Sequence, residues 1–452
     1  MVTPIPVPPA YQRASAWSVL ALMILTHITL DLARQPVYFL IDPMQASLGM
    51  TTVEISILLG AAMAVPVTVM SLVGGWLSDR VSRRLLLGVS MLCCAGGAIV
   101  FATATQYEHL MAGRVLLGIG AGMHIPVAMT WISDAFPGEL RGRANALFFI
   151  ALSLGPAQGG IVTGFVSTLA QQGELTQLPW IGGLESWRLT LLVLALPALL
   201  VAPLVLFAPD RRILAGGKPA PHGRDGVQAI GALRWAEWRL PALMIAGVGL
   251  MVMVDTANIT WMPTVLKRKF DYDEQQVGYA FGAIATIAGI AGPLVGGWVG
   301  DAVSRRHGVG GRLWASAVIA VLCTVLLFAY FSTTQWFVLG ALALNGVLTV
   351  ATLVMGYVGL QAVLPPERRG LGTGAMAAGN SLIGATGPTV VAYFSHLIGS
   401  GPHALTLATA IVCPALSALA AVAIAMTARA HGRSHPASTP MPSAAAASRH
   451  PA

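Results

Sequence analysis

Charged residues are scarce in this chain. Asp, Glu, Lys and Arg together make up 10% of its 452 residues, whereas about a quarter of the residues of a soluble domain are charged. Hydrophobic residues make up 56%, and the mean hydropathy is +0.73. This composition excludes a soluble protein and predicts an integral membrane protein of the plasma membrane, which in a bacterium is the inner membrane.

Cysteines are few, and motifs of catalysis are missing. The four cysteines, Cys93, Cys94, Cys323 and Cys413, lie in apolar runs without metal-ligand spacing, so we expect packing residues and no metal site. The chain has no H-E-x-x-H pair, no His box and no nucleotide-binding loop. We therefore expect neither an enzyme nor a bound cofactor.

Long apolar runs are what the sequence has in abundance. Twelve runs of about 20 or more residues are each long enough to cross a bilayer as a helix. Their ranges are 16–41, 52–77, 85–105, 109–135, 144–169, 187–208, 240–266, 276–299, 313–331, 335–363, 370–396 and 403–428. The sequence thus predicts an all-α membrane protein of twelve transmembrane helices, surrounded by lipid and monomeric.

The basic residues give the orientation of these helices. Most of the 26 Lys and Arg residues fall in alternate loops, and basic loops stay on the cytoplasmic side. Both termini are therefore expected in the cytoplasm, and the net charge of +8 requires no nucleic-acid partner. The expected organisation is an N-terminal cytoplasmic segment (1–15), a six-helix bundle (16–208), a cytoplasmic linker (209–239), a second six-helix bundle (240–428) and a disordered tail (429–452).

One short segment occurs twice. G-G-W-L-S-D-R-V-S-R-R (Gly74–Arg84) returns as G-G-W-V-G-D-A-V-S-R-R (Gly296–Arg306), with eight of eleven positions identical. Each copy is a loop between two expected helices, so the chain is a duplication. We predict a cytoplasmic gate in which each acid pairs with an Arg of its loop or accepts backbone amides of a facing helix, and in which the first copy is the stronger latch because Ala302 replaces Arg80. The gate residues are Asp79, Arg80, Arg83, Arg84, Asp301, Arg305 and Arg306.

Further motifs accompany the repeat. Arg114–Gly122 reads R-V-L-L-G-I-G-A-G, Gly155–Gly160 reads G-P-A-Q-G-G, and Pro365–Gly370 reads P-P-E-R-R-G. With the six-plus-six arrangement, they resemble the major facilitator superfamily of secondary transporters. The resemblance implies alternating access, and G-P-A-Q-G-G is similar to a signature of its antiporters. Gly155, Pro156, Gly159 and Gly160 are its helix-packing residues.

A narrower resemblance is to the spinster-like branch of that superfamily. It is carried by Ala33–Gln45 and Ser186–Leu200, and the branch is associated with export of lysolipids or sphingoid phosphates. Arg34 and Arg114 match the branch. Ala33 and Ala121 stand where the branch has acids.

Ionisable residues inside the bilayer are rare and mark candidate sites. His27, Asp31, Arg34 and Tyr38 are spaced by three or four residues and share one helix face. We expect Asp31 to carry protons for coupling; the alternative is a structural salt bridge. Arg114 is expected to bind an anionic group or to pair with Asp31. His124 lies in the same expected helix as Arg114 but is rotated off the face of Arg114, and it is either a titrating group or a packing residue.

The second half has one comparable acid, Asp255, at nearly the position that Asp31 holds in the first. With Asn258 and Trp261 it is expected to bind the solute or a proton, or else to contact a neighbouring helix. Further polar residues are expected at the interface of the halves, where transporters bind their solutes. They are Gln158, Asn345, Thr349 and Asn380.

These features together predict a proton-coupled secondary transporter of a small organic or amphipathic solute, with export by antiport favoured. The alternative is proton-coupled uptake of an organic anion, for which Arg34 and Arg114 supply positive charge. A remoter alternative is a membrane sensor that binds a solute without moving it.

Overall fold

The computed structural model is helical in every element that it describes. It describes residues 9–78, 80–136, 138–175, 177, 183–208, 235–364, 369–399, 401 and 403–434. The first half comprises α1 (Pro9–Arg34), η1 (Pro36–Tyr38), α2 (Ile41–Leu48), α3 (Thr52–Leu59), α4 (Ala61–Ser78), α5 (Arg83–Ala102), α6 (Tyr107–Ala135), α7 (Gly138–Gln171) and α8 (Ser186–Leu206). The second comprises α11 (Trp235–Phe270), α12 (Glu274–Leu327), η2 (Phe328–Phe331), α13 (Gln335–Val363), α14 (Arg369–Ala385), α15 (Gly387–Ile398) and α16 (Ala404–Ser434).

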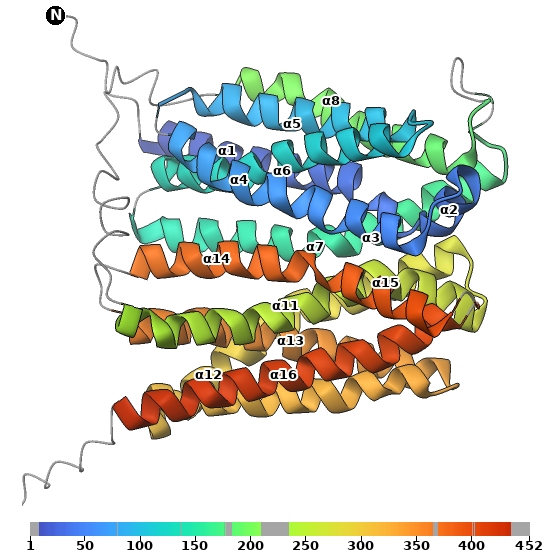
Figure 1. Ribbon diagram of the computed structural model, residues 1–452. Coiled ribbons are helices and arrows are strands. Elements are labelled where there is room, and N and C mark those ends of the chain that lie inside the picture. The colour runs from blue at the N-terminus through green and yellow to red at the C-terminus, as the bar shows by residue number, and fades with distance from the viewer. Residues whose placement is uncertain are drawn as a thin grey trace, which may run out of the picture.

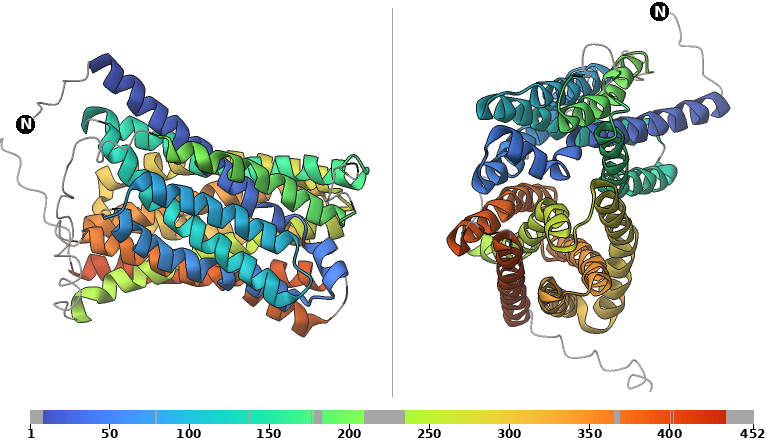
Figure 2. Two further views of the ribbon diagram at one scale, coloured as in Figure 1. Left: turned by 90° about the horizontal axis from the view of Figure 1, so that it is seen from above. Right: turned by 90° about the vertical axis from the view of Figure 1, so that its right-hand side faces the viewer.

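The two halves form two bundles that lie side by side (Figure 1; Figure 2, right). The helices run nearly parallel to one long direction. α1 begins and α16 ends at the same end of the molecule, here called the terminal end, while α2 lies at the opposite end, here called the α2 end. Helices of the first half contact helices of the second, among them α7 with α12, α3 with α15 and α4 with α14.

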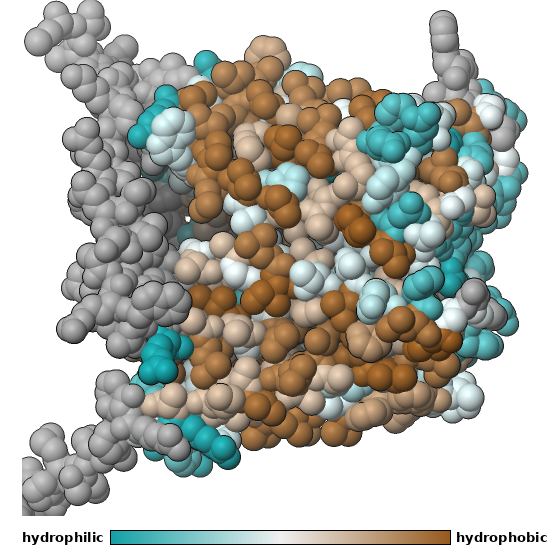
Figure 3. Space-filling model, in the orientation of Figure 1, coloured by the Kyte–Doolittle hydropathy of each residue, from teal (hydrophilic) through white to brown (hydrophobic). Residues whose placement is uncertain are grey.

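The lengths and hydropathy of the helices agree with a membrane location. Ten helices of the described residues are long and apolar enough to cross a membrane. Apolar side chains cover the middle of the face seen in Figure 3, and polar side chains gather at the α2 end. Two expected spans, 276–299 and 313–331, correspond to two helical stretches that share the label α12 and are separated by a kink at Gly308, the second running on into η2. A third, 370–396, is divided into α14 and α15, each too short for a span by itself.

The division between α14 and α15 has a local cause. Pro388 has no backbone N–H and its ring crowds the carbonyl of Gly384, four residues earlier, so the helix breaks there. Thr256 of α11 donates a hydrogen bond to that freed carbonyl at 2.5 Å. Trp261, also of α11, donates to the carbonyl of Pro388 at 3.0 Å. The break is therefore held against α11.

The ends of the helices differ from the expected spans. α1 already begins at Pro9, since proline is well suited to the first turn of a helix. α16 continues to Ser434 through Ala and Arg residues, which favour helix. α11 already begins at Trp235, five residues before the expected span. Most of the expected linker, 209–234, lies outside the described residues.

The G-P-A-Q-G-G segment packs α7 against helices of both halves. A side chain at Gly155 would overlap the Asp31 carboxylate of α1, and one at Gly159 would come within 2.7 Å of Gln35 Cβ. On the other side, a side chain at Gly160 would come within 3.3 Å of the backbone of Gly278 in α12. Small residues let helix backbones approach closely. The segment thus packs α7 between α1 and α12.

Candidate functional site

A cavity of about 300 Å³ lies between the halves. From the first half it is lined by residues of α1, η1, α3, α4, α6 and α7, and from the second by residues of α11, α14 and α15. Its polar side chains are Arg34, Gln35, Tyr38, Arg114, Thr256, Thr260, Asn380 and Ser381. The two cations of this set come from the first half. The second half contributes hydroxyl and amide groups.

Asp31 lies directly behind this cavity. Its carboxylate is fully buried and accepts a short hydrogen bond from Arg34 Nε. Its other oxygen is 3.3 Å from His27 Nε2. The Arg34 side chain is 31% exposed, so the guanidinium reaches the cavity while the acid does not. A transported group that approaches this site meets Arg34 before it meets Asp31.

Arg114 occupies the same wall of the cavity. It donates to Tyr38 Oη at 3.1 Å and to the backbone carbonyl of Arg34 at 3.3 Å. The expected pairing of Arg114 with Asp31 is not the one that forms, because Arg34 already occupies the carboxylate. Both partners of Arg114 are uncharged. The side chain is 1% exposed, and its positive charge has no direct ion-pair partner within the described residues.

His124 does not lie on the cavity but beside His27. The two imidazole rings are stacked with centroids 5.5 Å apart, and Phe148 closes the other side of His27 at 6.1 Å. Neither ring nitrogen of His124 has a hydrogen-bond partner within the described residues. The sequence spacing predicts that His124 lies off the face of Arg114. In the structure it contacts His27, and His27 lies between it and Asp31.

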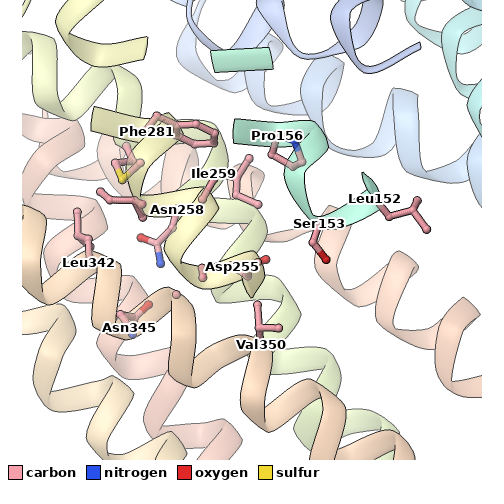
Figure 4. Close-up of a pocket in the computed structure, with 16 residues that line it drawn as sticks. Leu152, Ser153, Pro156, Asp255, Asn258, Ile259, Phe281, Leu342, Asn345 and Val350 are labelled. Carbon is pink, nitrogen blue, oxygen red and sulfur yellow. The ribbon is translucent and has the colours of Figure 1, made fainter. Parts of the chain in front are cut away.

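A second cavity of about 200 Å³ adjoins the first, because Pro156 and Ile259 line both. It lies among α7, α11, α12 and α13, and Asp255 is its acid (Figure 4). Asp255 makes no ion pair with any residue that the structure describes. A charged group at the centre of a bilayer costs about 2.5–3.5 kcal/mol on insertion scales. An acid left unpaired there is a candidate for binding.

Several expected cavity residues instead hold helices together. Trp261 is fully buried and bonds to the α14–α15 break. Gln158 donates to the carbonyl of Ile28 in α1 at 3.1 Å. Thr349 is buried with its hydroxyl 3.9 Å from Cys323 Sγ. Asn258 and Asn345 line the second cavity and Asn380 the first, as the sequence predicted for residues at the interface.

Gln35, Ser153 and Thr256 also line the cavities, and the sequence analysis did not predict them. Each lies within two residues of a predicted site residue. That proximity was the available signal. It was weak because neighbouring residues on a helix point about 100° apart.

Two ion pairs of the repeated loops can be described, and each lies inside one half. Arg83 pairs with Asp134 at the end of α6, at 2.7 Å. Asp301 pairs with Arg312 at 2.7 Å, and not with Arg305, which is exposed. The expected pairing of Asp301 within its own motif is therefore wrong. The chain bends at Gly308 and brings Arg312 back to the acid.

The other residues of the first copy have different surroundings. Arg80 lies over the ring of Trp76, 4.0 Å from its centroid, and donates to the carbonyl of that residue. This contact stays within one segment, so the structure does not give Arg80 the part of a latch. Arg84 is half-buried and Arg306 is exposed. Asp79 lies outside the described residues.

Charged contacts join the halves at the α2 end. Arg268 of α11 donates to Asp42 of α2 at 2.7 and 3.2 Å, and to Gln45 at 3.2 Å. Lys267 donates to the carbonyl of Phe39 at 2.8 Å. These contacts bind the two halves together at the α2 end.

Comparisons with known proteins agree with this architecture. The family model described as Major Facilitator Superfamily matches residues 23–307 and 244–450. The arabinose-proton symporter of Escherichia coli is 34% identical over 34% of this chain and 28% of its own length. Protein spinster of Drosophila melanogaster is 24% identical over 73% of this chain and 54% of its own. The chain thus matches less than two thirds of the length of these relatives.

A solved structure has the same fold. It is a bacterial homologue of the human lysosomal transporter spinster, in an inward-facing and unoccupied conformation. It superposes with a TM-score of 0.73, covers 94% of this chain and 96% of its own, and has 17% sequence identity. At that identity, the likeness concerns the fold alone.

Proposed function

This multi-pass membrane protein belongs to the Major Facilitator Superfamily, and we propose that it transports a small organic anion together with a proton by alternating access. The observation that carries the proposal is the arrangement of Arg34, which reaches the cavity and is neutralised from behind by Asp31. In this proposal the chain crosses the membrane twelve times, α12 and the α14–α15 pair supplying the additional crossings, with both termini in the cytoplasm.

The cavity suits an anionic group. Arg34 and Arg114 both line it, and Arg114 has only neutral hydrogen-bond partners. A guanidinium binds a carboxylate, sulfonate or phosphate through two parallel hydrogen bonds. Thr256, Asn380 and Ser381 of the second half complete the wall. A bound anion therefore contacts both halves, which is what a solute must do to affect their relative movement.

Coupling follows from competition for Arg34. While Asp31 is ionised, its carboxylate holds the Arg34 guanidinium and opposes binding of a second anion. A proton on Asp31 removes that competitor, so proton binding and anion binding favour each other. Positive coupling of this sign is the basis of symport. The geometry thus supports the symport hypothesis more than antiport, which rests on the G-P-A-Q-G-G segment.

His27 and His124 extend the same site in this proposal. His27 lies 3.3 Å from Asp31, and His124 stacks on His27. Protons that reach Asp31 from the side away from the cavity would pass along these rings. The proposed route keeps the proton apart from the solute.

The state described here is closed at the α2 end, which our topology places outside. The bonds of Arg268 to Asp42 and of Lys267 to Phe39 hold that end together. Their release, with formation of contacts between the repeated loops at the terminal end, would open the cavity to the outside. The motif residues Asp79, Arg83, Arg84, Asp301, Arg305 and Arg306 remain the proposed gate at the terminal end, whereas Arg80, whose contacts stay within its own segment, is left out of it.

Proteoliposomes test this function. Alkyl- and arylsulfonates are suitable probes because they stay charged and cross lipid poorly without a carrier. With the outside acidified, labelled benzenesulfonate and a series of alkylsulfonates should accumulate inside, and a pH dye should report proton entry. The Asp31→Asn protein should still bind these anions but lose the effect of pH, while wild-type affinity should fall by about tenfold per pH unit once Asp31 is ionised.

Two results would overturn the proposal. Expulsion of the anion by an inward proton gradient would indicate antiport, as the sequence motif favours. Binding without movement across the membrane would indicate a sensor. Protein-free liposomes are the control for passive leakage.

A further inference from the structure

Asp255 is the acid that the proposed coupling does not use. It lines the second cavity with three other polar side chains, Asn258, Asn345 and Ser153, in walls that are otherwise apolar. Figure 4 shows Asp255 and Asn258 on one side of α11, with Asn345 of α13 and Ser153 of α7 on either side of them. The cavity is thus polar at one place.

The hydrogen bonds described around Asp255 do not use all of the acceptor groups of the residues that line this cavity. Asn345 donates its amide nitrogen to the carbonyl of Cys323 at 3.3 Å, which leaves its amide oxygen to the cavity. Asn258 accepts from the Tyr330 hydroxyl at 2.8 Å, so its amide nitrogen is the part left over. The carboxylate has no ion-pair partner within the described residues. Two carboxylate oxygens and an amide oxygen at one place fit a group that is cationic and donates several hydrogen bonds.

The two cavities adjoin, and helix α11 stands at their boundary. Asp255 and Asn258 line the second cavity, whereas Thr256 and Thr260 of the same helix line the first. Pro156 and Ile259 belong to both walls. A molecule that passes these two apolar residues therefore has one end among Arg34 and Arg114 and the other at Asp255.

From this placement we propose that the solute is dipolar, with an anionic group at Arg34 and Arg114, a short apolar linker past Pro156 and Ile259, and an ammonium group at Asp255. The inference rests on the proposed function and deepens it by naming the class of solute. A simple anion would leave Asp255 without a partner among the residues that line this cavity. An aminoalkyl acid satisfies both ends, and cavities of about 300 and 200 Å³ suit a small molecule of this kind.

Matched probes test the proposal on the full-length protein in detergent or nanodiscs. Each pair consists of an alkylsulfonate and the ω-aminoalkylsulfonate of the same length, from two to eight carbons, together with benzenesulfonate and its aminomethyl derivative. Binding is measured by calorimetry. For the pair whose length fits, the amino compound should bind wild-type protein at least about tenfold more tightly, which corresponds to about 1.4 kcal/mol.

The variants separate the two ends of the solute. Asp255→Asn should remove the advantage of the amino compound and leave binding of the plain sulfonate unchanged. Arg114→Gln should weaken both members of a pair. Ser153→Ala is a matched control that alters the same cavity and keeps the acid, so the advantage should persist.

The outcomes distinguish failure of the inference from failure of the function. If sulfonates bind through Arg114 but the amino group confers no advantage at any length, or if Asp255→Asn keeps the advantage, the solute is not dipolar and the anion function stands. If no anion of the panel binds, both fail. If Na⁺, tested against choline, tightens binding of plain sulfonates only while Asp255 is present, this acid binds a free cation and the proposal of a dipolar solute is wrong.

Discussion

Substitution of Gly155 by Ala tests the central feature of the site, the fully buried Asp31 pair. A Cβ atom at this position would overlap Asp31 Oδ2, lie 2.8 Å from Asp31 Cγ and lie 3.3 Å from His27 Nε2. A carboxylate displaced by the new Cβ atom would also shift its contacts with Arg34 and His27. Overpacking of this kind costs about 1–3 kcal/mol. If the ion pair breaks as well, the cost rises to about 3–5 kcal/mol.

The matched control is Gly297→Ala in α12, where a Cβ atom would meet nothing within 4 Å. Alanine is favoured over glycine inside a helix by roughly 1 kcal/mol, so the control should be neutral or stabilising. At about 2–4 °C per kcal/mol for a domain the size of one half, the overpacking cost of Gly155→Ala should lower the midpoint of thermal unfolding by roughly 2–12 °C. The two substitutions are thus expected to have opposite signs.

Thermal unfolding is measurable with a thiol-reactive dye, because Cys94, Cys323 and Cys413 are buried and become reactive on unfolding. A second measurement repeats Gly155→Ala in an Asp31→Ala background, where the overlapping atoms are gone. The loss should then be smaller by at least about 1 kcal/mol, the scale of coupling between residues in contact. Equal losses in the two backgrounds, or a loss no larger than that of Gly297→Ala, would refute the claim that Gly155 makes room for Asp31.

Three further predictions concern the cations. Arg114→Gln should weaken binding of benzenesulfonate by about 10–100-fold in calorimetry, since a hydrogen bond to a charged group contributes about 1.5–3 kcal/mol; an unchanged affinity would remove Arg114 from the site. In an otherwise cysteine-free protein, Arg268→Gln should raise the labelling from outside of a cysteine placed at Ala285. The increase should be up to about fivefold, because the Arg268–Asp42 pair is partly exposed. No increase would mean that this pair does not close the α2 end. Arg83→Gln should lower the unfolding midpoint while Arg80→Ala leaves it unchanged, because only Arg83 bridges two helices; the reverse order would restore Arg80 as the latch.

Part of the site was predictable because it depends on neighbours along one helix. His27, Asp31 and Arg34 are three or four residues apart, and the structure joins them as that spacing predicts. The placement of Asp255 at an interface of the halves followed from its equivalence to Asp31 in the duplicated sequence. The repeat could not predict how these two acids differ. Asp31 is buried and paired, whereas Asp255 lines a cavity without an ion pair among the described residues.

Partners that lie far apart in the sequence were beyond prediction. Arg83 and Asp134 are 51 residues apart, and Arg268 and Asp42 are 226 apart. Whether such side chains meet depends on how each helix is rotated and where it breaks. The break at Pro388 and the bend at Gly308 alter those rotations locally. The periodic pattern of a single helix contains neither its rotation relative to other helices nor the position of its breaks.

The sequence by itself determined that this is a helical membrane protein, that it is a duplication, and to which superfamily it belongs, because apolar length and repeated motifs are properties of a segment read alone. The tertiary structure was needed to find that Asp31 pairs with Arg34 behind the cavity, that Arg114 donates to uncharged groups, and that Asp255 lines a second cavity without an ion pair to any described residue. These are properties of pairs of helices, and inside a bilayer the strength of a charge depends on which partner the packing brings to it.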